Sequence, residues 1–235
     1  MQVNADTWVL VLTGAGVSAD SGVPTFRGAG GLWEGHRVEE VASPQGFRRD
    51  PELVWRFYAE RRRRAGGVAP NAGHVALARL EERIGDRFLL ATQNVDGLHR
   101  RAGSRRLVEL HGNLFTSRCA DCDRAPFPDE VAHASVPACD ACGGVLRPHI
   151  VWFGETLDGG DLSRVAEFMA RAARHRFVFL AVGTSGAVWP AAGFVDDARA
   201  AGAETWLVNL EPPENEGAFD HFLQGKSAEI LPGLV

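Results

Sequence analysis

Short, predominantly apolar runs recur along the chain, and each ends at small or polar residues. Runs of this kind are typical of strands that are buried on both faces of a parallel sheet. The clearest runs cover Trp8–Leu12, Phe88–Thr92, Phe177–Val182 and Glu204–Asn209. Segments with apolar residues at helical spacing cover Val75–Ile84 and Ala187–Ala201. Because buried strands alternate with helices, we predict an α/β fold with a doubly wound, Rossmann-like parallel sheet.

Two stretches depart from this alternation. Residues 36–72 have apolar positions at helical spacing, most clearly in 51–64, whereas residues 115–150 have no clear periodicity. We expect both to be inserts that form a smaller lobe over the main sheet. The length of 235 residues suits one large α/β domain, so we expect a single domain over 1–235.

Composition and charge restrict the class of protein. The formal net charge of -5 argues against broad nucleic-acid binding, which needs a positive surface. We expect no membrane span, because no apolar stretch approaches 18 residues. The first residues lack a basic segment followed by an apolar one, so we expect no secretory signal and a cytoplasmic location. We also expect a monomer.

A glycine-rich turn follows the first apolar run. Gly14, Ala15, Gly16 and Ala19 fit the pattern Gly-x-Gly-x-x-Gly/Ala between a strand and a helix. Such glycines allow backbone N–H groups to approach phosphates, and a helix N-terminus adds the positive end of a dipole. The alternative is a tight strand-to-helix turn without a ligand. We predict a dinucleotide site and take NAD as the first candidate.

The residues after this turn differ from those of a typical dehydrogenase. In such enzymes a second strand ends in an acidic residue about 20 residues after the glycines. Here residues 21–33 are rich in glycine and proline, and they include Thr25, Phe26, Arg27 and Trp33. We interpret this stretch as a loop that covers the reactive end of a cofactor, which disfavours ordinary hydride transfer.

The four cysteines of the chain occur as two pairs, Cys119 with Cys122 and Cys139 with Cys142. Two residues separate the members of each pair, and 16 residues separate the pairs. This spacing is typical of a four-thiolate zinc site. Four sulfurs complete a tetrahedral shell, so we expect one structural zinc ion per chain; free or redox-active cysteines are the alternative.

Polar residues follow two further apolar runs. Gln93, Asn94 and Asp96 come directly after the second strand, at the end where doubly wound folds bind ligands. A polar turn is the alternative, because Asn and Asp are common in turns. His111 ends another apolar run. Taken alone such a histidine is more often structural, but its side chain is suited to proton transfer near neutral pH.

In their order along the chain, these motifs resemble those of the sirtuins, the NAD-dependent protein-lysine deacylases. The matching segments read GAGVSADSGVPTFRG, TQNVDGLH, ELHGN, the two CxxC pairs, PHIVWFGE, GTSGAVWPAA and NLEPP, and the resemblance runs from about residue 8 to residue 228. It implies a Rossmann-like large domain and a small lobe made of the zinc module and the helical insert. NAD would lie between them and be consumed as a co-substrate.

The resemblance also implies roles for individual residues. The NAD site would be formed by Gly14, Ala15, Gly16, Ala19, Thr25, Phe26, Arg27, Trp33, Gln93, Asn94, Asp96, Gly183, Thr184, Ser185, Asn209, Leu210, Glu211 and Ala228. In the implied reaction the acyl oxygen attacks the ribose as nicotinamide leaves, and the product is an O-acyl-ADP-ribose. His111 would be the general base on a ribose hydroxyl, and Asn94 a second catalytic residue.

The same resemblance implies the substrate site. Acyl-lysine proteins would bind as extended peptides that pair, as a strand, with Val151, Trp152, Phe153 and Gly154. Tyr58 and Arg61 match the Tyr-x-x-Arg motif of the class III sirtuins, which prefer succinyl- and malonyl-lysine. Ala42 resembles the small residue that widens their acyl pocket.

Elementary geometry is consistent with this acyl preference. Residues three apart share a helix face, and a planar guanidinium suits a carboxylate. The alternative is that Tyr58 is a core aromatic and that Arg61–Arg64 form a solvated helix face. Other possible functions are a deacetylase without acidic preference, an NAD-dependent protein ADP-ribosyltransferase and a binding module without turnover.

Overall fold

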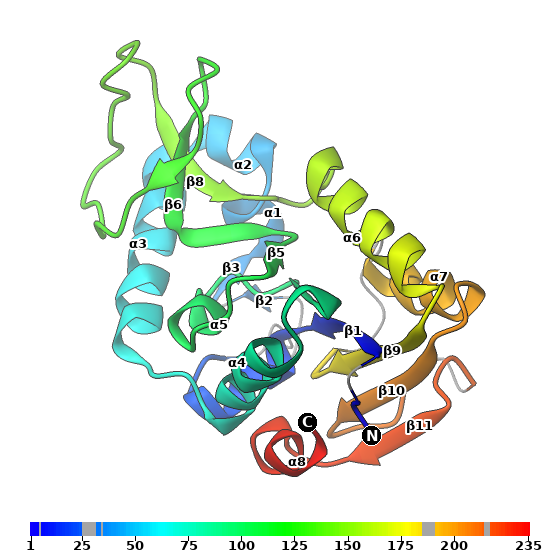
Figure 1. Ribbon diagram of the computed structural model, residues 1–235. Helices are drawn as coiled ribbons and strands as arrows, with labels where there is room; N and C mark the ends of the chain where they lie inside the picture. Colours follow the sequence, from blue (N-terminus) through cyan, green and yellow to red (C-terminus); the bar gives the residue numbers. More distant parts are fainter. Residues whose placement is uncertain (5, 25–31, 34, 185–190, 214–216) are drawn as a thin grey trace.

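A parallel sheet of six strands forms the centre of the molecule (Figure 1). The structure is a computed structural model that describes residues 1–4, 6–24, 32–33, 35–184, 191–213 and 217–235. The strands, in the order of the sheet, are β11 (His221–Gln224), β10 (Glu204–Asn209), β9 (Arg176–Val182), β1 (Thr7–Thr13), β4 (Phe88–Thr92) and β5 (Leu107–Glu109). The four predicted strands are confirmed, and no bound differs by more than one residue.

Different helices cover the two faces of this sheet. They are α4 (Ala72–Ile84), α6 (Gly159–Ala172), α7 (Phe194–Ala200) and α8 (Ser227–Leu234). In β1, Trp8, Leu10 and Leu12 pack into the apolar cluster that includes α6 and α7. Val9 and Val11 pack into the cluster of α4 and α8 on the other face. This alternation makes a three-layer α/β/α domain, as predicted.

Two predicted helices have different bounds. The helix expected at Val75–Ile84 begins earlier, since the Asn71 side chain accepts a hydrogen bond from the amide of His74 and caps α4. The one expected at Ala187–Ala201 is α7, preceded by the 3-10 turn η3 (Ala191–Gly193); residues 187–190 lie outside the described part of the chain. No helix in the described ranges is long and apolar enough to cross a membrane.

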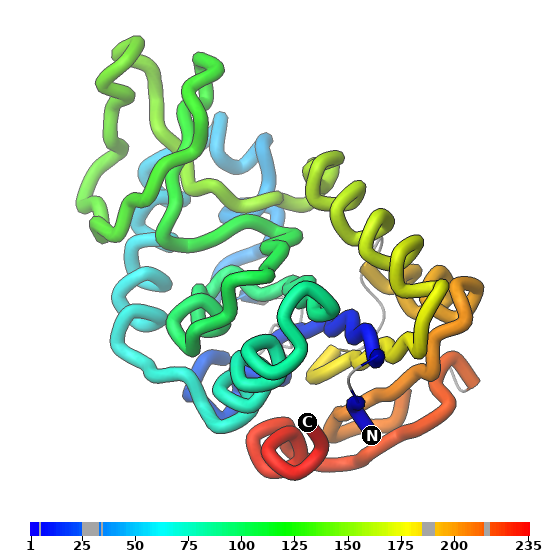
Figure 2. The backbone as a smooth tube through the Cα atoms, in the orientation of Figure 1, coloured from blue at the N-terminus to red at the C-terminus, as the bar shows by residue number. Residues whose placement is uncertain are grey.

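The helical insert and the cysteine-containing segment form the predicted small lobe. Its elements are β2 (Leu32–Trp33), β3 (His36–Arg37), α1 (Val38–Val41), α2 (Pro44–Arg49), α3 (Pro51–Gly67), β6 (Gly112–Cys119), β7 (Phe127–Pro128) and β8 (Leu146–Ile150). The last three strands form an antiparallel sheet in the order β7-β6-β8. Trp55 and Tyr58 of α3 share one apolar cluster with Leu146 and Trp152. The lobe stands at one end of the molecule, and both chain termini lie at the other end, near α8 (Figure 2).

The order in which the chain adds strands to the sheet reverses at β1, with β4 and β5 on one side and β9, β10 and β11 on the other. β1 pairs in parallel with β4 on one side and with β9 on the other. In doubly wound sheets this switch point is where ligands bind. The glycine turn follows β1, Gln93 follows β4 and Gly183 follows β9, so three predicted cofactor segments begin there.

Candidate active site

The glycine turn after β1 lies directly against the turn after β9, and their backbones are in contact. The N–H of Gly14 donates to the carbonyl of Val182 (3.0 Å), and that of Gly16 donates to the carbonyl of Gly183 (2.8 Å). A Cβ on Gly16 would lie 2.7 Å from the Cα of Gly183, which is closer than side chains tolerate. Both amides are thus used within the chain, and the absence of side chains on these glycines allows the two loops to touch.

The helix after this turn is η1 (Ala15–Ser21), a 3-10 helix. Its residue Ser18 belongs to a buried polar cluster with the carboxyl end of β4. The Asn94 Nδ2 donates to the carbonyl of Gly14 and to the Ser18 Oγ, at 3.1 Å each. The Ser18 hydroxyl donates to the Asp96 Oδ2 at 2.7 Å. The fold therefore brings Asn94 and Asp96 together with a serine that the sequence reasoning did not select.

Asp96 is buried, and its carboxylate has two partners. Besides Ser18, the N–H of Leu98 donates to its Oδ1 at 2.9 Å. Burial raises the pKa of Asp96, while the hydrogen bonds from Leu98 and Ser18 act in the opposite direction.

His111 lies in the short turn between β5 and β6, after the strand rather than at its last position. Its Nδ1 lies 2.9 Å from the carbonyl oxygen of Gln93. Because a carbonyl can only accept, Nδ1 carries the proton, and Nε2 of the neutral ring is the basic nitrogen. Burial lowers the pKa of His111, although the bond to Gln93 raises it in part. The side chain of Gln93 in turn donates to the Thr184 Oγ1 at 3.1 Å.

Further buried polar groups lie beneath the cluster, and none was selected from the sequence. The Thr13 hydroxyl contacts the Thr92 Oγ1 (2.8 Å) and the His99 Nε2 (2.9 Å). The rings of His74 and His99 are 4.7 Å apart, and the His74 Nε2 lies 3.4 Å from the Ser18 Oγ. Burial lowers the pKa of His74 to about 4 and that of His99 well below its usual value, so both are neutral at pH 7. The one signal in the sequence is that two buried strands each end in a threonine.

The other predicted cofactor residues lie at the carboxyl end of β10 and on α8. Asn209 donates through Nδ2 to the carbonyl of Glu211 (3.1 Å), and Leu210 between them is 55% exposed. Ala228 is on α8, which contacts both β10 and η1. The predicted residues Thr25, Phe26, Arg27 and Ser185 lie outside the described residues.

Tyr58 and Arg61 lie on α3 in the small lobe. Tyr58 is completely buried, and its Oη accepts a hydrogen bond from the Trp152 Nε1 at 2.9 Å. Burial raises the pKa of Tyr58 to about 12, although the positive charge of Arg61 acts in the opposite direction. The Arg61 guanidinium lies over the Trp33 ring, 4.1 Å from its centroid. Ala42 is buried in the same cluster as Tyr58.

The run Arg61–Arg64 is not a uniform solvated face, which corrects the simplest sequence interpretation. Arg62 is buried, and it donates to the Asp129 carboxylate (3.1 Å) and to the carbonyl of Leu114 (2.6 Å). Only Arg63 and Arg64 extend into solvent, where both pair with Glu60. Arg62 thus joins α3 to the sheet of the small lobe.

Residues Val151–Gly154 follow β8 and are not a strand in the described structure. The N–H of Val151 donates to the carbonyl of His111 (2.9 Å), and that of Phe153 donates to the carbonyl of Ala42 (3.0 Å). The N–H of Trp152 donates to Glu155. A peptide that pairs here as an extended strand must therefore use the Gly154 N–H or carbonyl oxygens.

The four cysteines meet at one point of the small lobe. Their sulfur atoms all lie within 4.8 Å of one another, and two of the pairs are 3.6 and 4.0 Å apart. Tetrahedral zinc with Zn–S bonds of about 2.3 Å needs sulfurs about 3.8 Å apart. The amides of Asp121 and Gly144 each donate to a sulfur at 3.3 Å, which favours thiolate. The residues present therefore fit a structural zinc ion.

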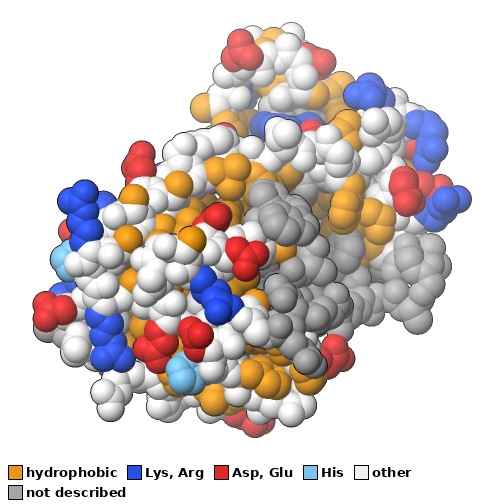
Figure 3. Space-filling view, turned by 90° about the vertical axis from the view of Figure 1, so that its right-hand side faces the viewer, with side chains coloured by type: hydrophobic (Ala, Val, Ile, Leu, Met, Phe, Trp, Pro, Cys, Tyr) orange, Lys and Arg blue, Asp and Glu red, His pale blue; other side chains and the backbone are white. Residues whose placement is uncertain are grey.

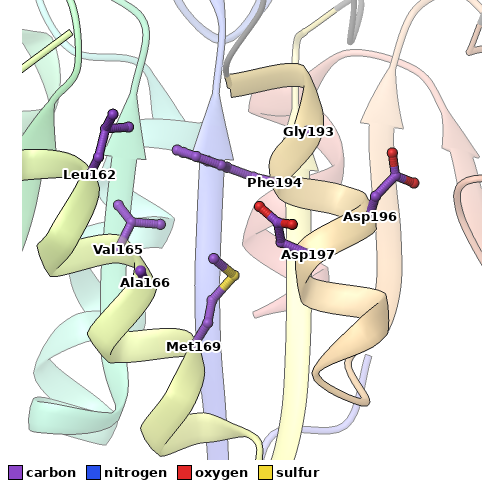
Figure 4. A pocket seen from close by; sticks show the side chains of 8 residues that line it. All are labelled: Leu162, Val165, Ala166, Met169, Gly193, Phe194, Asp196 and Asp197. Atoms are coloured by element: carbon purple, nitrogen blue, oxygen red, sulfur yellow. The ribbon is translucent and has the colours of Figure 1, made fainter. Parts of the chain in front are cut away.

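A groove between α6 and α7 lies apart from all these residues. It has a volume of about 370 Å³ and is lined by Leu162, Val165, Ala166, Met169, Gly193, Phe194, Asp196 and Asp197 (Figure 4). Phe194 of α7 points toward the apolar side chains of α6, and both carboxylates belong to α7. No residue predicted for the cofactor or the substrate lines it.

Comparison with known proteins decides the family. The model of the Sir2 family matches residues 14–190. The chain belongs to the Sir2 family. The resemblance to the sirtuins that the motifs predict is thereby confirmed.

The relatives of this Sir2-family chain include named deacylases. It is 48% identical over 230 residues to the NAD-dependent protein deacylase of Shigella flexneri, covering 97% of this chain and 82% of the relative. Identity to the protein of the same name from Escherichia coli strain K12 is 47%, with 97% and 80% covered.

Solved structures of Sir2 proteins are similar to this chain in both fold and sequence. A Sir2 homologue in complex with NAD is 42% identical, with a TM-score of 0.87 over 96% of this chain and 87% of that chain. Sir2 in complex with an inhibitor, 2'-O-acetyl-ADP-ribose and a deacetylated peptide is 31% identical, with a TM-score of 0.80 over 97% and 92% of the two chains.

Proposed function

We propose that this Sir2-family enzyme is an NAD-dependent protein-lysine deacylase that prefers succinyl- and malonyl-lysine to acetyl-lysine. The enzyme transfers the acyl group to ADP-ribose and releases nicotinamide and free lysine. The observation that carries the acyl preference is the pair on α3, a fully buried phenol at Tyr58 beside the Arg61 guanidinium. Family membership and the names of the relatives support the deacylase activity.

NAD binds at the switch point of the sheet in this proposal, between the glycine turn and the turns after β4, β9 and β10. When bound, NAD supplies an electrophilic ribose carbon and a nicotinamide leaving group. Both Nδ2 protons of Asn94 are committed to Gly14 and Ser18, so its Oδ1 remains to accept from a ribose hydroxyl. Because its partners hold it rigidly, Asn94 positions the ribose without reorganisation.

His111 removes the proton from a ribose hydroxyl in the acyl-transfer step. Its Nδ1 proton is held by the Gln93 carbonyl, so the acceptor is Nε2. A lowered pKa keeps the ring neutral at pH 7, which is the form that a general base needs. The bond from Val151 N–H to the His111 carbonyl joins this base to the segment proposed to bind the peptide.

Tyr58 and Arg61 recognise the terminal carboxylate of a succinyl or malonyl group. With a pKa of about 12, Tyr58 is neutral and can donate its proton. Arg61 is permanently charged and can donate two parallel hydrogen bonds to a carboxylate. An acetyl group has no carboxylate and gains nothing from either residue. Ala42, small and buried in the same cluster, leaves space for the longer acyl chain.

The cysteine cluster holds one structural zinc ion in this proposal, and residues 36–72 and 115–150 form most of the small lobe. We further propose a monomer that acts in the cytoplasm. On the face in Figure 3, Lys and Arg side chains are interspersed with Asp and Glu, and no broad positive surface is visible. This mixture of charges gives the face no positive footprint for a nucleic-acid backbone.

The test is the substitution Arg61→Met, which keeps the side-chain length and removes the charge. We expect kcat/KM for a succinyl-lysine peptide to fall about 10- to 100-fold, as when a charged hydrogen-bond partner is lost. The value for the matching acetyl-lysine peptide should fall far less. Arg63→Met, on the same helix but exposed, is the matched control and should not change the ratio. An equal loss on both substrates contradicts the carboxylate clamp.

A further inference from the structure

Trp152 provides the one hydrogen bond that the Tyr58 hydroxyl makes within the described part of the chain. The indole Nε1 donates to the phenol oxygen at 2.9 Å, and both side chains are buried, at 2% and 0% exposed. The phenol therefore accepts from the protein, while its own proton has no acceptor among the described residues. A buried donor without an acceptor is costly, so this proton is available to a bound ligand oxygen.

The indole itself is held from several sides. The Arg147 guanidinium lies over its ring, 3.5 Å from the centroid, and the Phe47 ring lies 5.3 Å away. Glu155 accepts the backbone N–H of Trp152 (2.8 Å) and two hydrogen bonds from Arg147 (2.6 and 2.9 Å). These contacts fix both the backbone and the ring plane, so the direction of the indole N–H is fixed too.

Glu155 is ionised in this arrangement. Burial acts to raise its pKa, but the hydrogen bonds from Arg147 and from the Trp152 backbone outweigh it and hold the pKa below its usual range. Arg118 also pairs with this carboxylate at 3.3 Å. The charged group is thus an anchor for Trp152 rather than a group that titrates near neutral pH.

We propose that Trp152 is a positioning residue that determines acyl specificity. Its N–H occupies the acceptor side of the Tyr58 hydroxyl and so turns the phenol proton toward the carboxylate of an acidic acyl group. The inference rests on the proposed preference for succinyl- and malonyl-lysine, and it adds a residue that acts through Tyr58. Without the indole N–H, the hydroxyl can rotate and loses its fixed direction.

Trp55 shows what a purely structural indole in the same lobe does. It is also fully buried, and its Nε1 donates to the backbone carbonyl of Leu146 at 2.9 Å. That acceptor belongs to β8 and has no proton to orient. Trp55 is therefore a matched control for the loss of a buried indole hydrogen bond.

The experiment compares Trp152→Phe with Trp55→Phe in the zinc-loaded, full-length enzyme. We measure kcat/KM for a succinyl-lysine and an acetyl-lysine peptide of the same sequence. For Trp152→Phe we expect the succinyl-to-acetyl ratio to fall about tenfold, as for the loss of one hydrogen bond, mainly through KM. For Trp55→Phe the ratio should stay unchanged. A ratio that is unchanged in Trp152→Phe overturns the proposal.

A double-substitution cycle tests whether Trp152 acts through Tyr58. In a Tyr58→Phe background no hydroxyl is left to orient, so adding Trp152→Phe should lower the ratio no further. Losses that simply add would mean that Trp152 acts in another way, and would overturn the inference. If Arg61→Met leaves the ratio unchanged, the acidic-acyl proposal itself fails; if it lowers the ratio and Trp152→Phe does not, only the role of Trp152 fails.

The hydrogen bond can also be observed without turnover. Tyr58 is the only tyrosine of the chain, so tyrosine labelled with ¹³C at Cζ gives a single NMR resonance. We expect Trp152→Phe to shift this resonance and Trp55→Phe to leave it in place. An unshifted resonance in a folded Trp152→Phe variant would show that the indole does not act on the phenol.

Discussion

His111 shows how one backbone contact can set the chemistry of a side chain. The Gln93 carbonyl fixes the proton on Nδ1, and burial disfavours the charged ring. The sequence predicts this histidine because it follows an apolar run within a recognisable motif. It does not predict Ser18, His74 or His99, since their roles depend on partners that only folding brings together. The burial of Arg62 likewise depends on partners from β6 and its neighbouring loop, Leu114 and Asp129.

The lowered pKa of His111 predicts the pH dependence of the reaction. The base is active when neutral, so activity falls as the pH falls through the pKa of His111. Because burial lowers that pKa from its ordinary value of 6.5, the acid limb of kcat/KM should lie below pH 6.5, with a plateau at pH 7.

Substitution isolates this base from other histidines. His111→Gln should reduce kcat at least about 100-fold, as expected for the loss of a general base. His149→Gln is the control. His149 is a half-buried histidine on β8 and does not belong to the proposed site. An acid limb centred above pH 7, or an active His111→Gln enzyme, would refute the assignment.

At the scale of elements, a strand can be predicted from the sequence when burial of apolar side chains stabilises it. The strands β1, β4, β9 and β10 are recognisable because burial between two helix layers makes nearly every residue apolar. The edge strand β11 is only half-buried and has no such signal. β6 and β8 escape prediction because a cysteine cluster replaces part of the apolar core in their lobe. The two glycine turns are predictable as turns, but their mutual contact is not.

Zinc binding should stabilise the small lobe and have little effect on the stability of the large domain. Cys119 and Cys139 belong to the same apolar cluster as Tyr58, so metal loss should loosen α3 together with β6 and β8. Hydrogen exchange after treatment with a strong chelator should show lost protection in these elements, while β1 and β9 stay protected. Deacylation should fall with it and return when zinc is added.

A matched pair of variants tests the same point genetically. Cys142→Ser should abolish the content of one zinc per chain and lower the Tm on the order of 10 °C. Asp123→Asn, in the same segment but outside the cluster, should change neither. A metal-free protein with full activity and unchanged exchange would contradict a structural zinc.

At the scale of the whole molecule, the proposed chemistry depends on two lobes meeting. The large domain supplies the polar cluster around Asn94, and the small lobe supplies Tyr58 and Arg61. His111 stands at the junction, bonded to Gln93 on one side and, through its carbonyl, to Val151 on the other. Motifs in the sequence predict both lobes and the family, but the contacts between them emerge only from the fold.

We propose that the enzyme consumes NAD to remove acidic acyl groups from lysine. The most direct measurement is mass spectrometry of peptides with acetyl-, malonyl-, succinyl- and glutaryl-lysine, incubated with and without NAD. We predict NAD-dependent loss of succinyl and malonyl groups, faster than loss of acetyl, with equal amounts of nicotinamide and O-acyl-ADP-ribose. Loss of acetyl alone, or transfer of ADP-ribose to protein without deacylation, would contradict the account.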